Sequence, residues 1–268
     1  MNLIQVECLR KDYRERGVLG SGRVVPGLNE ASFSITAGST LALVGESGSG
    51  KSTLALCVAC LERPTSGKIW FGGRDIAALE QKELRGVRPQ IQLVFQDPAS
   101  SFNPRFSALE IVTEPLLLQK SWKRHQTRER GFALLERVGL SPEMAGRRAG
   151  DLSGGQKRRL AIARALSLEP KLLILDEALS ALDCSVRAQI ANLLIDLQKS
   201  LALTFLFITH DLAVAVHLAD EIAVMDHGRI VEQGIPEKLL AFPEHEATHR
   251  LIAATPPTIR RSQMAGAC

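Results

Sequence analysis

Short runs of consecutive apolar residues alternate along this chain with longer stretches in which apolar and polar residues recur at helical spacing. Residues 40–44, 171–175 and 204–208 are such apolar runs, and each predicts a buried β-strand. Residues 53–61 follow the first run after a Gly/Ser loop and predict a helix. Polar residues follow the second and third runs. The pattern predicts an α/β fold with a largely parallel sheet, whose strand ends open onto a ligand site.

The middle of the chain differs from the rest in its high content of helix-forming residues. Residues 97–158 are rich in helix formers, and within them residues 126–138 predict a helix that ends at Gly139. We therefore expect an α/β core from residues 1–96 and 159–243, a helical subdomain from residues 97–158 and a C-terminal tail from residues 244–268. Because the tail carries two prolines and a Gly/Ala/Ser-rich end, we expect order to fade in it.

Composition narrows the class of protein. A chain of 268 residues with 45% hydrophobic and 23% charged side chains can bury a sizeable core, which excludes intrinsic disorder. Five scattered cysteines and the lack of a secretory leader predict a reducing cytoplasm. No apolar run approaches the ~18 residues of a membrane span, so a membrane role needs partners. With a net charge of +4 and 4% aromatic residues, we expect no nucleic-acid partner.

The loop after the first predicted strand carries the first chemical motif. Residues 45–52 read G-E-S-G-S-G-K-S and fit the phosphate-loop pattern G-x-x-x-x-G-K-[ST]. In such a loop backbone amides turn toward phosphate oxygens, Lys51 reaches the β- and γ-phosphates, and Ser52 gives an oxygen to Mg²⁺. The structural alternative is a flexible glycine loop. The residues expected to contact the nucleotide are Gly45, Glu46, Ser47, Gly48, Ser49, Gly50, Lys51, Ser52 and Thr53.

Two acids end the second predicted strand. Asp176 and Glu177 follow residues 171–175, and burying paired carboxylates is costly unless a cation or protons neutralise them. Beside a phosphate loop, Asp176 is placed to hold the water shell of Mg²⁺, and Glu177 to accept a proton from an attacking water. A simple turn is the alternative.

A third motif, L-S-G-G-Q, occupies residues 152–156. Ser153 and Gln156 spell an S-x-x-Q capping box at a helix start, which structure alone could explain. Two consecutive glycines are not needed for capping. By removing side chains where a helix N-terminus faces an anion, they suggest a second phosphate-binding surface.

With this motif the chain resembles the ATP-binding subunits of ABC transporters, in which L-S-G-G-Q is the signature motif. Tyr13 is similar to the aromatic residue that stacks on adenine, Gln96 to the glutamine of the Q-loop, Asp183 to the aspartate of the D-loop, and His210 to the switch histidine. The resemblance covers roughly residues 3–240. It implies a P-loop NTPase (RecA-like) core with an antiparallel β part and an inserted helical subdomain.

The resemblance also implies a mechanism. Two such subunits face head to tail, so that ATP bound at Lys51 of one chain meets the signature residues of the other: Ser153, Gly154, Gly155 and Gln156. ATP binding closes the dimer and hydrolysis reopens it. Glu177 would polarise the attacking water, and His210 would hold the γ-phosphate. Gln96 would sense the metal, with Ser52 and Asp176 as the other metal-binding residues, and adjoin a transmembrane partner.

Residues 96–105, Q-D-P-A-S-S-F-N-P-R, are similar to a segment of the peptide and nickel importer ATPases, and residues 245–256 partly resemble the tail of that group. This implies an ATPase driving uptake of peptides or nickel through two separate transmembrane subunits. The implied location is peripheral, on the cytoplasmic face of the inner membrane. A different second ATPase chain would complete the pair, and a solute-binding protein would act indirectly. The alternative is a soluble, non-transport ABC ATPase acting on nucleic acid or ribosomes.

Two further motifs point elsewhere and are set aside. Residues 245–249 match H-E-x-x-H, the zinc protease helix motif, but nothing in the short tail offers a third ligand. Cys57 and Cys60 form a C-x-x-C without a second pair, and we expect them to pack as small hydrophobic residues. Only Cys268 lies beyond Cys184, so we expect no iron–sulfur cluster.

Overall fold

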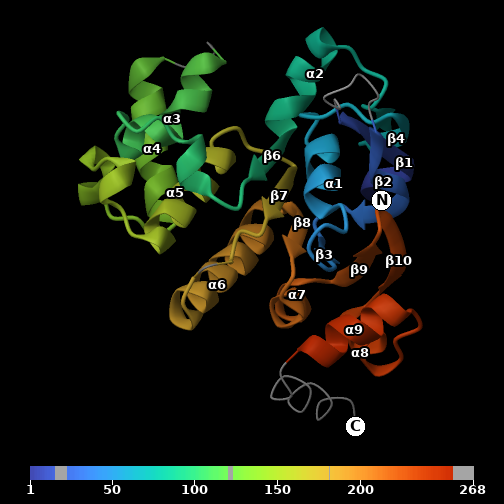
Figure 1. Cartoon of the computed structure of the whole chain (residues 1–268). Helices are drawn as coiled ribbons and strands as arrows, with labels where there is room; N and C mark the ends of the chain where they lie inside the picture. The colour runs from blue at the N-terminus through green and yellow to red at the C-terminus, as the bar shows by residue number, and fades with distance from the viewer. Residues whose placement is uncertain (16–22, 120–122, 181, 256–268) are drawn as a thin grey trace. The chain divides into compact units, whose positions relative to one another are not determined.

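The computed structural model describes residues 1–15, 23–119, 123–180 and 182–255 (Figure 1). The chain forms two compact units. The first comprises residues 1–85 and the chain from Thr204 onward, and the second comprises residues 86–203.

The first unit contains an antiparallel sheet of four strands in the order β2-β1-β4-β5. It also contains a group in which β3 pairs in parallel with both β8 and β9, while β10 pairs with β9 in antiparallel fashion. The strands are β1 (Asn2–Glu15), β2 (Arg23–Thr36), β3 (Thr40–Val44), β4 (Ser66–Phe71), β5 (Arg74–Asp75), β8 (Thr204–Thr209), β9 (Glu221–Asp226) and β10 (Arg229–Gly234). Every residue of β3 and β8 is buried, as expected for the continuous apolar runs of a parallel sheet.

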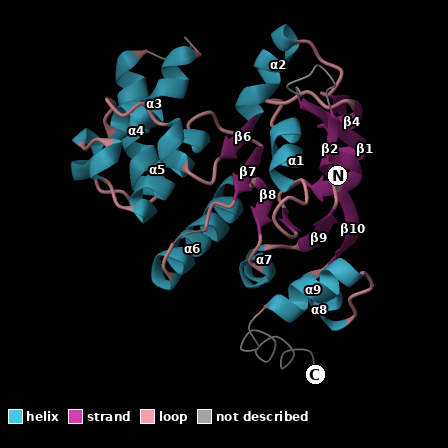
Figure 2. Ribbon diagram, viewed as in Figure 1, coloured by secondary structure: helices cyan, strands magenta, loops and turns pink. Residues whose placement is uncertain are grey.

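Short helices accompany these strands (Figure 2). They are α1 (Lys51–Val58), α2 (Gln81–Val87, which ends two residues into the second unit), α7 (Leu212–Leu218), α8 (Pro236–Ala241) and α9 (Glu246–Ala254). The last helix is anchored through Glu232 of β10, whose carboxylate accepts hydrogen bonds from the Thr248 hydroxyl and from the backbone N–H groups of Glu244 and His245.

The second unit combines a parallel strand pair with helices. Strands β6 (Ile91–Val94) and β7 (Leu172–Asp176) pair in register from Ile91 with Leu172 to Val94 with Leu175. The α-helices are α3 (Ala108–Leu118), α4 (Arg124–Arg137), α5 (Gly154–Leu166) and α6 (Cys184–Leu201). The 3₁₀ helices among the described residues of this unit are η1 (Arg88–Gln90), just before β6, η2 (Pro98–Ser101), between β6 and α3, and η3 (Pro142–Gly146) and η4 (Ala149–Asp151), between α4 and α5.

Helices α3, α4 and α5 of the second unit pack around a shared hydrophobic core. Helices α3, α4 and α5 lie together in Figure 1, and their inward faces bury large aliphatic side chains: Ile111, Leu116, Leu135, Leu160 and Ile162. The helix α3 begins with a full capping box between Ser107 and Glu110. Those Ser107 hydrogen bonds lower the pKa of the Glu110 carboxyl.

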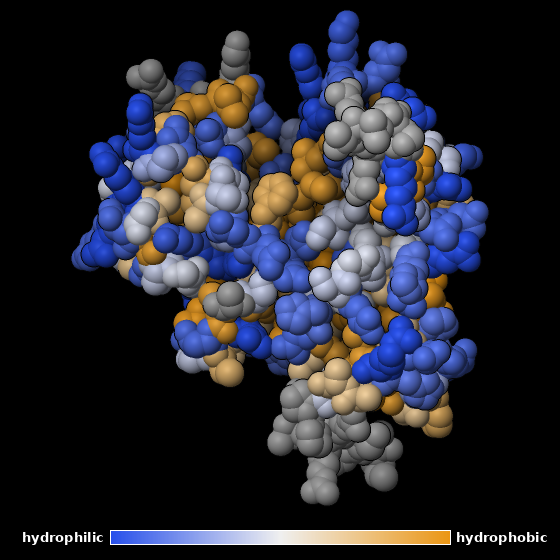
Figure 3. Space-filling model, in the orientation of Figure 1, coloured by the Kyte–Doolittle hydropathy of each residue, from blue (hydrophilic) through white to orange (hydrophobic). Residues whose placement is uncertain are grey.

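On the face seen in Figure 3, hydrophobic residues are interspersed among hydrophilic ones. Within the described ranges, no helix combines the length and apolar character that a bilayer crossing requires.

The three predicted strands are confirmed as β3, β7 and β8. The predicted helix before Gly139 is confirmed as α4, and Gly139 takes the left-handed φ of +73° that ends many helices. The helix predicted over residues 53–61 is instead α1, which ends at Val58, so Cys60 lies outside it with a φ of +57°.

The expectation that order fades from Glu244 onward is wrong for residues 246–254, which form α9, while residues 256–268, including Cys268, lie outside the described residues. The described part of residues 97–158 is helical apart from loops and one isolated bridge between Ser107 and Arg148. The second unit is larger than this segment because it also holds β6, β7 and α6. The predicted division of the chain into three parts stays a prediction.

Candidate nucleotide site

The phosphate loop connects β3 to α1 in the first unit. Gly50 has a φ of +106°, and a Cβ there would lie 2.5 Å from the carbonyl oxygen of Gly27, so only glycine fits. No side chain caps α1, and its first turn has no acidic residue. A helix start without a side-chain cap or an acidic first turn is a setting in which backbone N–H groups and the helix dipole favour an anion.

Lys51 lies across this loop rather than in solvent. Its Nζ donates hydrogen bonds to the carbonyl oxygens of Gly45 (2.8 Å) and Glu46 (2.7 Å) and to Ser49 Oγ (3.2 Å). The side chain is nearly covered, since the residue is 6% exposed. A buried ammonium held by loop carbonyls places a positive charge where an entering phosphate would meet it. Ser47 and Ser52 are exposed beside it, and Thr53 is half-buried.

Helix α9 contacts the same loop, a contact that no sequence pattern predicts. Arg250 of α9 donates from Nε to Glu46 Oε1 at 3.1 Å, and its guanidinium also pairs with Asp226 and Glu246. The hydrogen bond to Glu46 raises the pKa of Arg250. Glu46 and Arg250 are 204 residues apart in sequence, so no local pattern reveals the pair.

Tyr13 lies on β1, held between two neighbours. The Lys11 ammonium lies 5.1 Å from the centroid of its ring, and a Cβ on Gly27 would lie 2.7 Å from its Cε2. Lys11 in turn donates to the Glu62 carboxylate and the Arg63 carbonyl. Burial lowers the pKa of Lys11, but the hydrogen bond and charge of Glu62 outweigh it and raise the pKa overall. These contacts give the ring a defined orientation.

His210 directly follows β8 and is exposed. The next residue, Asp211, caps α7 by accepting hydrogen bonds from the N–H groups of Ala213 and Val214. The switch position is therefore fixed by a strand on one side and a capped helix on the other.

The second unit brings two predicted catalytic residues into contact. Gln96, just after β6, donates from Nε2 to Glu177 Oε2 at 2.9 Å. Asp176 ends β7 and is half-buried. Glu177 has a φ of +47°, a left-handed conformation that is costly for a non-glycine residue and typical of functional sites. Its carbonyl oxygen accepts hydrogen bonds from the backbone N–H and hydroxyl of Ser180, which close the turn.

The signature residues begin α5. Ser153 and Gln156 form the predicted capping box: Ser153 Oγ accepts from the Gln156 N–H, and Gln156 Oε1 accepts from the Ser153 N–H. Gly155 has a packing reason besides ligand access, because a Cβ there would lie 2.6 Å from Val186 Cγ1. Asp183 caps α6 by accepting from the Val186 N–H. Ala181 of the D-loop segment lies outside the described residues.

The structure thus places the phosphate loop, Tyr13 and His210 in the first unit, and Gln96, Asp176, Glu177, the signature residues and Asp183 in the second. That Gln96, Asp176 and Glu177 serve the nucleotide bound at Lys51, and that the signature residues meet the nucleotide of a second chain, stays a prediction.

The residues expected to hold Mg²⁺ offer the right atoms. Ser52, Gln96 and Asp176 supply hydroxyl, amide and carboxylate oxygens, the hard ligands that Mg²⁺ prefers. Within the described ranges no group of three or more His, Cys, Asp or Glu side chains could hold a metal alone. A sparse oxygen set fits Mg²⁺, which keeps waters and phosphate oxygens as ligands. In the H-E-x-x-H segment, His245 Nδ1 accepts from the Ala247 N–H as the cap of α9.

The two cysteines after the phosphate loop are both buried. Burial raises the pKa of Cys57 to about 12, so its thiol remains protonated at neutral pH.

Known proteins are similar to this chain in sequence. The family model described as "ABC transporter" matches residues 28–180. The probable peptide ABC transporter ATP-binding protein y4tS of Sinorhizobium fredii is 50% identical over 256 residues, which are 95% of this chain and 72% of that protein. The dipeptide transport ATP-binding protein DppF of Escherichia coli is 43% identical over 266 residues, 98% of this chain and 80% of that protein.

Solved structures are similar over most of the chain. The dimeric ATP-binding cassette MJ0796 bound to ADP and Pi, in a post-hydrolysis state, has a TM-score of 0.78 at 29% identity, covering 87% of this chain and 98% of that chain. Clostridium perfringens cbiO1, part of the transporter complex cbiONQ, has a TM-score of 0.79 at 30% identity, covering 98% of this chain and 99% of that chain.

These matches confirm the predicted fold class, a P-loop core with an antiparallel β part and a helical insertion. The family model includes the phosphate loop, the signature motif and the acids at the end of β7. This chain therefore belongs to the ATP-binding proteins of the ABC transporter family and is an ATPase of the ABC type.

Proposed function

We propose that this chain is the ATP-hydrolysing subunit of a peptide importer, attached to the cytoplasmic face of the inner membrane by two transmembrane subunits. The names of the relatives support peptide cargo: one is called a peptide and the other a dipeptide transport protein, and both align along nearly the whole chain. The relatives described above give no such support for nickel. The observation that carries the hydrolytic role is the hydrogen bond between Gln96 and Glu177.

In this proposal the phosphate loop binds the triphosphate of ATP through Lys51 and the amides at the start of α1, and the Tyr13 ring stacks on adenine. Mg²⁺ bound by Ser52, Gln96 and Asp176 would neutralise phosphate charge. Glu177 accepts the proton of the attacking water, and the amide of Gln96 holds its carboxylate in position.

The site is completed by a second ATPase chain, which we expect to differ from this one. The capped start of α5 would present the signature residues to the γ-phosphate bound by the partner chain. Asp183 and His210 would contribute at the same interface. The dimeric state of the similar cassette supports this arrangement. Closure around ATP and reopening after hydrolysis would drive the transmembrane subunits.

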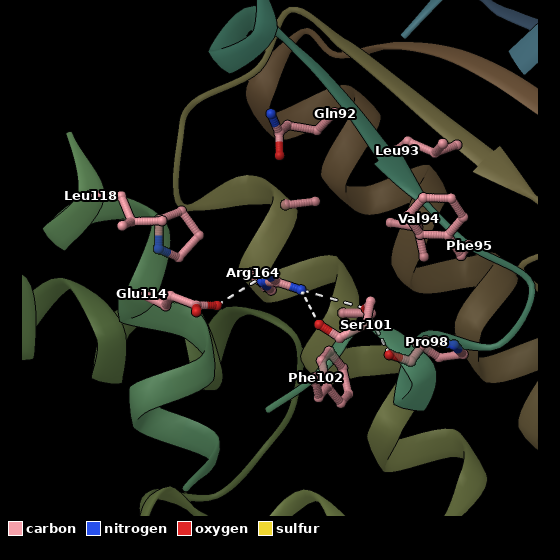
Figure 4. A pocket seen from close by; sticks show the side chains of 13 residues that line it. Gln92, Leu93, Val94, Phe95, Pro98, Ser101, Phe102, Glu114, Leu118 and Arg164 are labelled. Carbon is pink, nitrogen blue, oxygen red and sulfur yellow. Dashed lines mark hydrogen bonds and ion pairs between the residues drawn. The ribbon is translucent and has the colours of Figure 1, made fainter. Parts of the chain in front are cut away.

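A pocket in the second unit fits the docking of a transmembrane subunit (Figure 4). It has a volume of about 270 Å³, and its lining includes Phe95 and Pro98, which lie on either side of Gln96 and Asp97 in the sequence. Phe95 is 39% and Leu118 76% exposed along its lining, while Arg164 pairs with the Glu114 carboxylate inside it. We propose that it receives a short cytoplasmic helix of a transmembrane subunit with one apolar side chain and a polar flank. Because Phe95 of its lining precedes Gln96 in the chain, docking there would be linked to hydrolysis.

The proposal is tested by co-expressing the tagged chain with the two transmembrane subunits and the second ATPase. We expect all four chains to purify together, and peptide-loaded binding protein to stimulate ATP hydrolysis in proteoliposomes. The Lys51→Ala variant should assemble equally well but show no stimulation, because its phosphate loop lacks the ammonium. Recovery of ribosomes or nucleic acid instead of polytopic membrane proteins contradicts the proposal.

A further inference from the structure

A buried arginine connects the signature helix to the loop that carries Gln96. Arg158 lies on α5 and is 4% exposed. Its Nη1 donates to the carbonyl oxygen of Phe95 at 2.8 Å, and its Nη2 donates to that of Gln96 at 2.7 Å. Burial lowers the pKa of the guanidinium, and the nearby Asp97 carboxylate opposes that effect. An arginine nevertheless remains charged at every physiological pH.

The two hydrogen bonds fix the two peptide units on either side of the Gln96 Cα. Two consecutive carbonyl groups here converge on the two nitrogens of a planar, rigid fork. Charge-assisted hydrogen bonds of this kind are stronger than neutral ones, and burial shields them from water. Arg158 therefore sets the direction in which Gln96 leaves β6.

The Gln96 side chain connects the backbone held by Arg158 to Glu177. Its Nε2 donates to Glu177 Oε2 at 2.9 Å, so one continuous set of hydrogen bonds runs from Arg158 through Gln96 to Glu177. At its other end, Arg158 sits five residues after Ser153, the cap of α5. A shift of the start of α5 moves the guanidinium with it, because the helix is a rigid body at this length.

We propose that Arg158 is a positioning residue that links the start of α5 to Glu177 through Gln96, so that the glutamate is aligned only when the signature helix is in place. The inference rests on the proposed function, since it takes Glu177 as the general base and the start of α5 as a nucleotide contact. It adds a buried side chain that acts through the backbone carbonyl groups of Phe95 and Gln96, and a route by which the signature helix controls hydrolysis.

The neighbouring Arg159 provides a matched control. It lies on the same helix and also donates to a backbone carbonyl, that of Val138, and to the side chain of Gln189. Neither partner contacts Gln96 or Glu177 through any described hydrogen bond. Both arginines thus bind main-chain carbonyls from α5, but only Arg158 holds the Q-loop.

The test is a double-mutant cycle on ATP hydrolysis by the assembled transporter, with Arg158→Met, Gln96→Ala and the double variant. We expect Arg158→Met to lower kcat by about 5- to 20-fold with the KM for ATP unchanged within about 2-fold, since nucleotide binding does not use this link. In the Gln96→Ala background the same change should have no further effect, because the link is already cut. Arg159→Met should change kcat by the same factor in both backgrounds.

Variants that retain a hydrogen-bond donor at position 158 control for a general loss of stability in Arg158→Met. Arg158→Gln and Arg158→Lys can each satisfy one of the two carbonyls, so both should retain more activity than Arg158→Met at equal thermal stability. If Arg158→Met does not fold, the same cycle is run with Arg158→Lys.

The possible results distinguish failure of this inference from failure of the proposed function. If Gln96→Ala lowers kcat and Arg158→Met lowers it further by its full factor, the link is refuted while the proposed function stands. If Gln96→Ala leaves kcat unchanged, the role of Gln96 in the proposed function fails and the inference fails with it. A rise in KM at unchanged kcat for Arg158→Met also overturns the inference.

Discussion

Replacing Gly155 by alanine should destabilise the second unit, whereas the same change at Gly154 should not. A Cβ at Gly155 would lie 2.6 Å from Val186 Cγ1, far inside van der Waals contact. At Gly154 the nearest atom is Leu182 Cδ2 at 3.9 Å, an ordinary contact. Both glycines begin α5, so the two substitutions share the same helical setting.

The magnitude follows from the clash at Val186. Valine in a helix has one strongly preferred χ1 rotamer, so Val186 cannot turn aside without a cost of about 0.5–1.5 kcal/mol. Inserting a methyl group into a packed contact costs about 1–3 kcal/mol, against which alanine regains up to about 1 kcal/mol of helix propensity. We expect Gly155→Ala to lose about 1–2 kcal/mol and Gly154→Ala to be neutral or slightly stabilising.

The assay is urea unfolding of the full chain followed by far-UV circular dichroism, with thermal unfolding alongside. For a protein of this size, a loss of 1 kcal/mol lowers Tm by about 2–4 °C. Adding Val186→Ala should relieve the clash, so the double variant should lose less stability than the two single changes sum to. Equal stability of Gly154→Ala and Gly155→Ala, or strictly additive losses in the double variant, would refute this reasoning.

Three further predictions concern charge and thiol chemistry. Arg250→Ala should raise the KM for ATP about 2- to 5-fold at low salt, because the Glu46 carboxylate then faces the triphosphate without its arginine partner. This rise in KM should become smaller at 1 M salt and should be absent in the Glu46→Gln background. Burial alone raises the pKa of Glu232, but its three hydrogen bonds outweigh this effect and lower the pKa overall. The stability that Glu232 contributes is therefore present above about pH 4.5 and is lost as the pH falls through the pKa of the folded state. The unfolding free energies of wild type and Glu232→Gln, measured from pH 7 to pH 3, should converge at the acid end. Iodoacetamide at pH 8 should label the exposed Cys8 of the native protein but not the buried Cys57. The pKa of Cys57, about 12, leaves only about one molecule in 10⁴ with a thiolate at this position. Equal labelling of the two cysteines, measured by mass spectrometry, would contradict this prediction.

The sequence predicts the parts of this fold that depend on local pattern. The apolar runs that became β3, β7 and β8 are long enough and pure enough to indicate buried strands, and the capping box at Ser153 follows from residue types three apart. The Q-loop and switch positions, by contrast, came from resemblance to a family and not from periodicity.

The contacts that orient the site were not predictable, because they join distant residues. Arg158 binds carbonyl groups 62 and 63 residues away, and nothing in its neighbourhood distinguishes it from Arg159. The tail was misjudged for a similar reason. Its proline and glycine content predicts disorder, yet the buried Thr248 hydroxyl bonds to Glu232 and holds α9 in place. Local composition does not predict such contacts between residues that are distant in sequence.

The most direct test of the central claim is single-turnover ATP hydrolysis by Glu177→Gln in the assembled complex. Glutamine keeps the size of the side chain and can still accept the hydrogen bond from Gln96, but it cannot take a proton from water. We expect the rate to fall at least about 10²-fold while ATP binding stays within about 3-fold of wild type, and the two ATPase chains to remain locked together with ATP. Hydrolysis within about 2-fold of the wild-type rate would contradict the account.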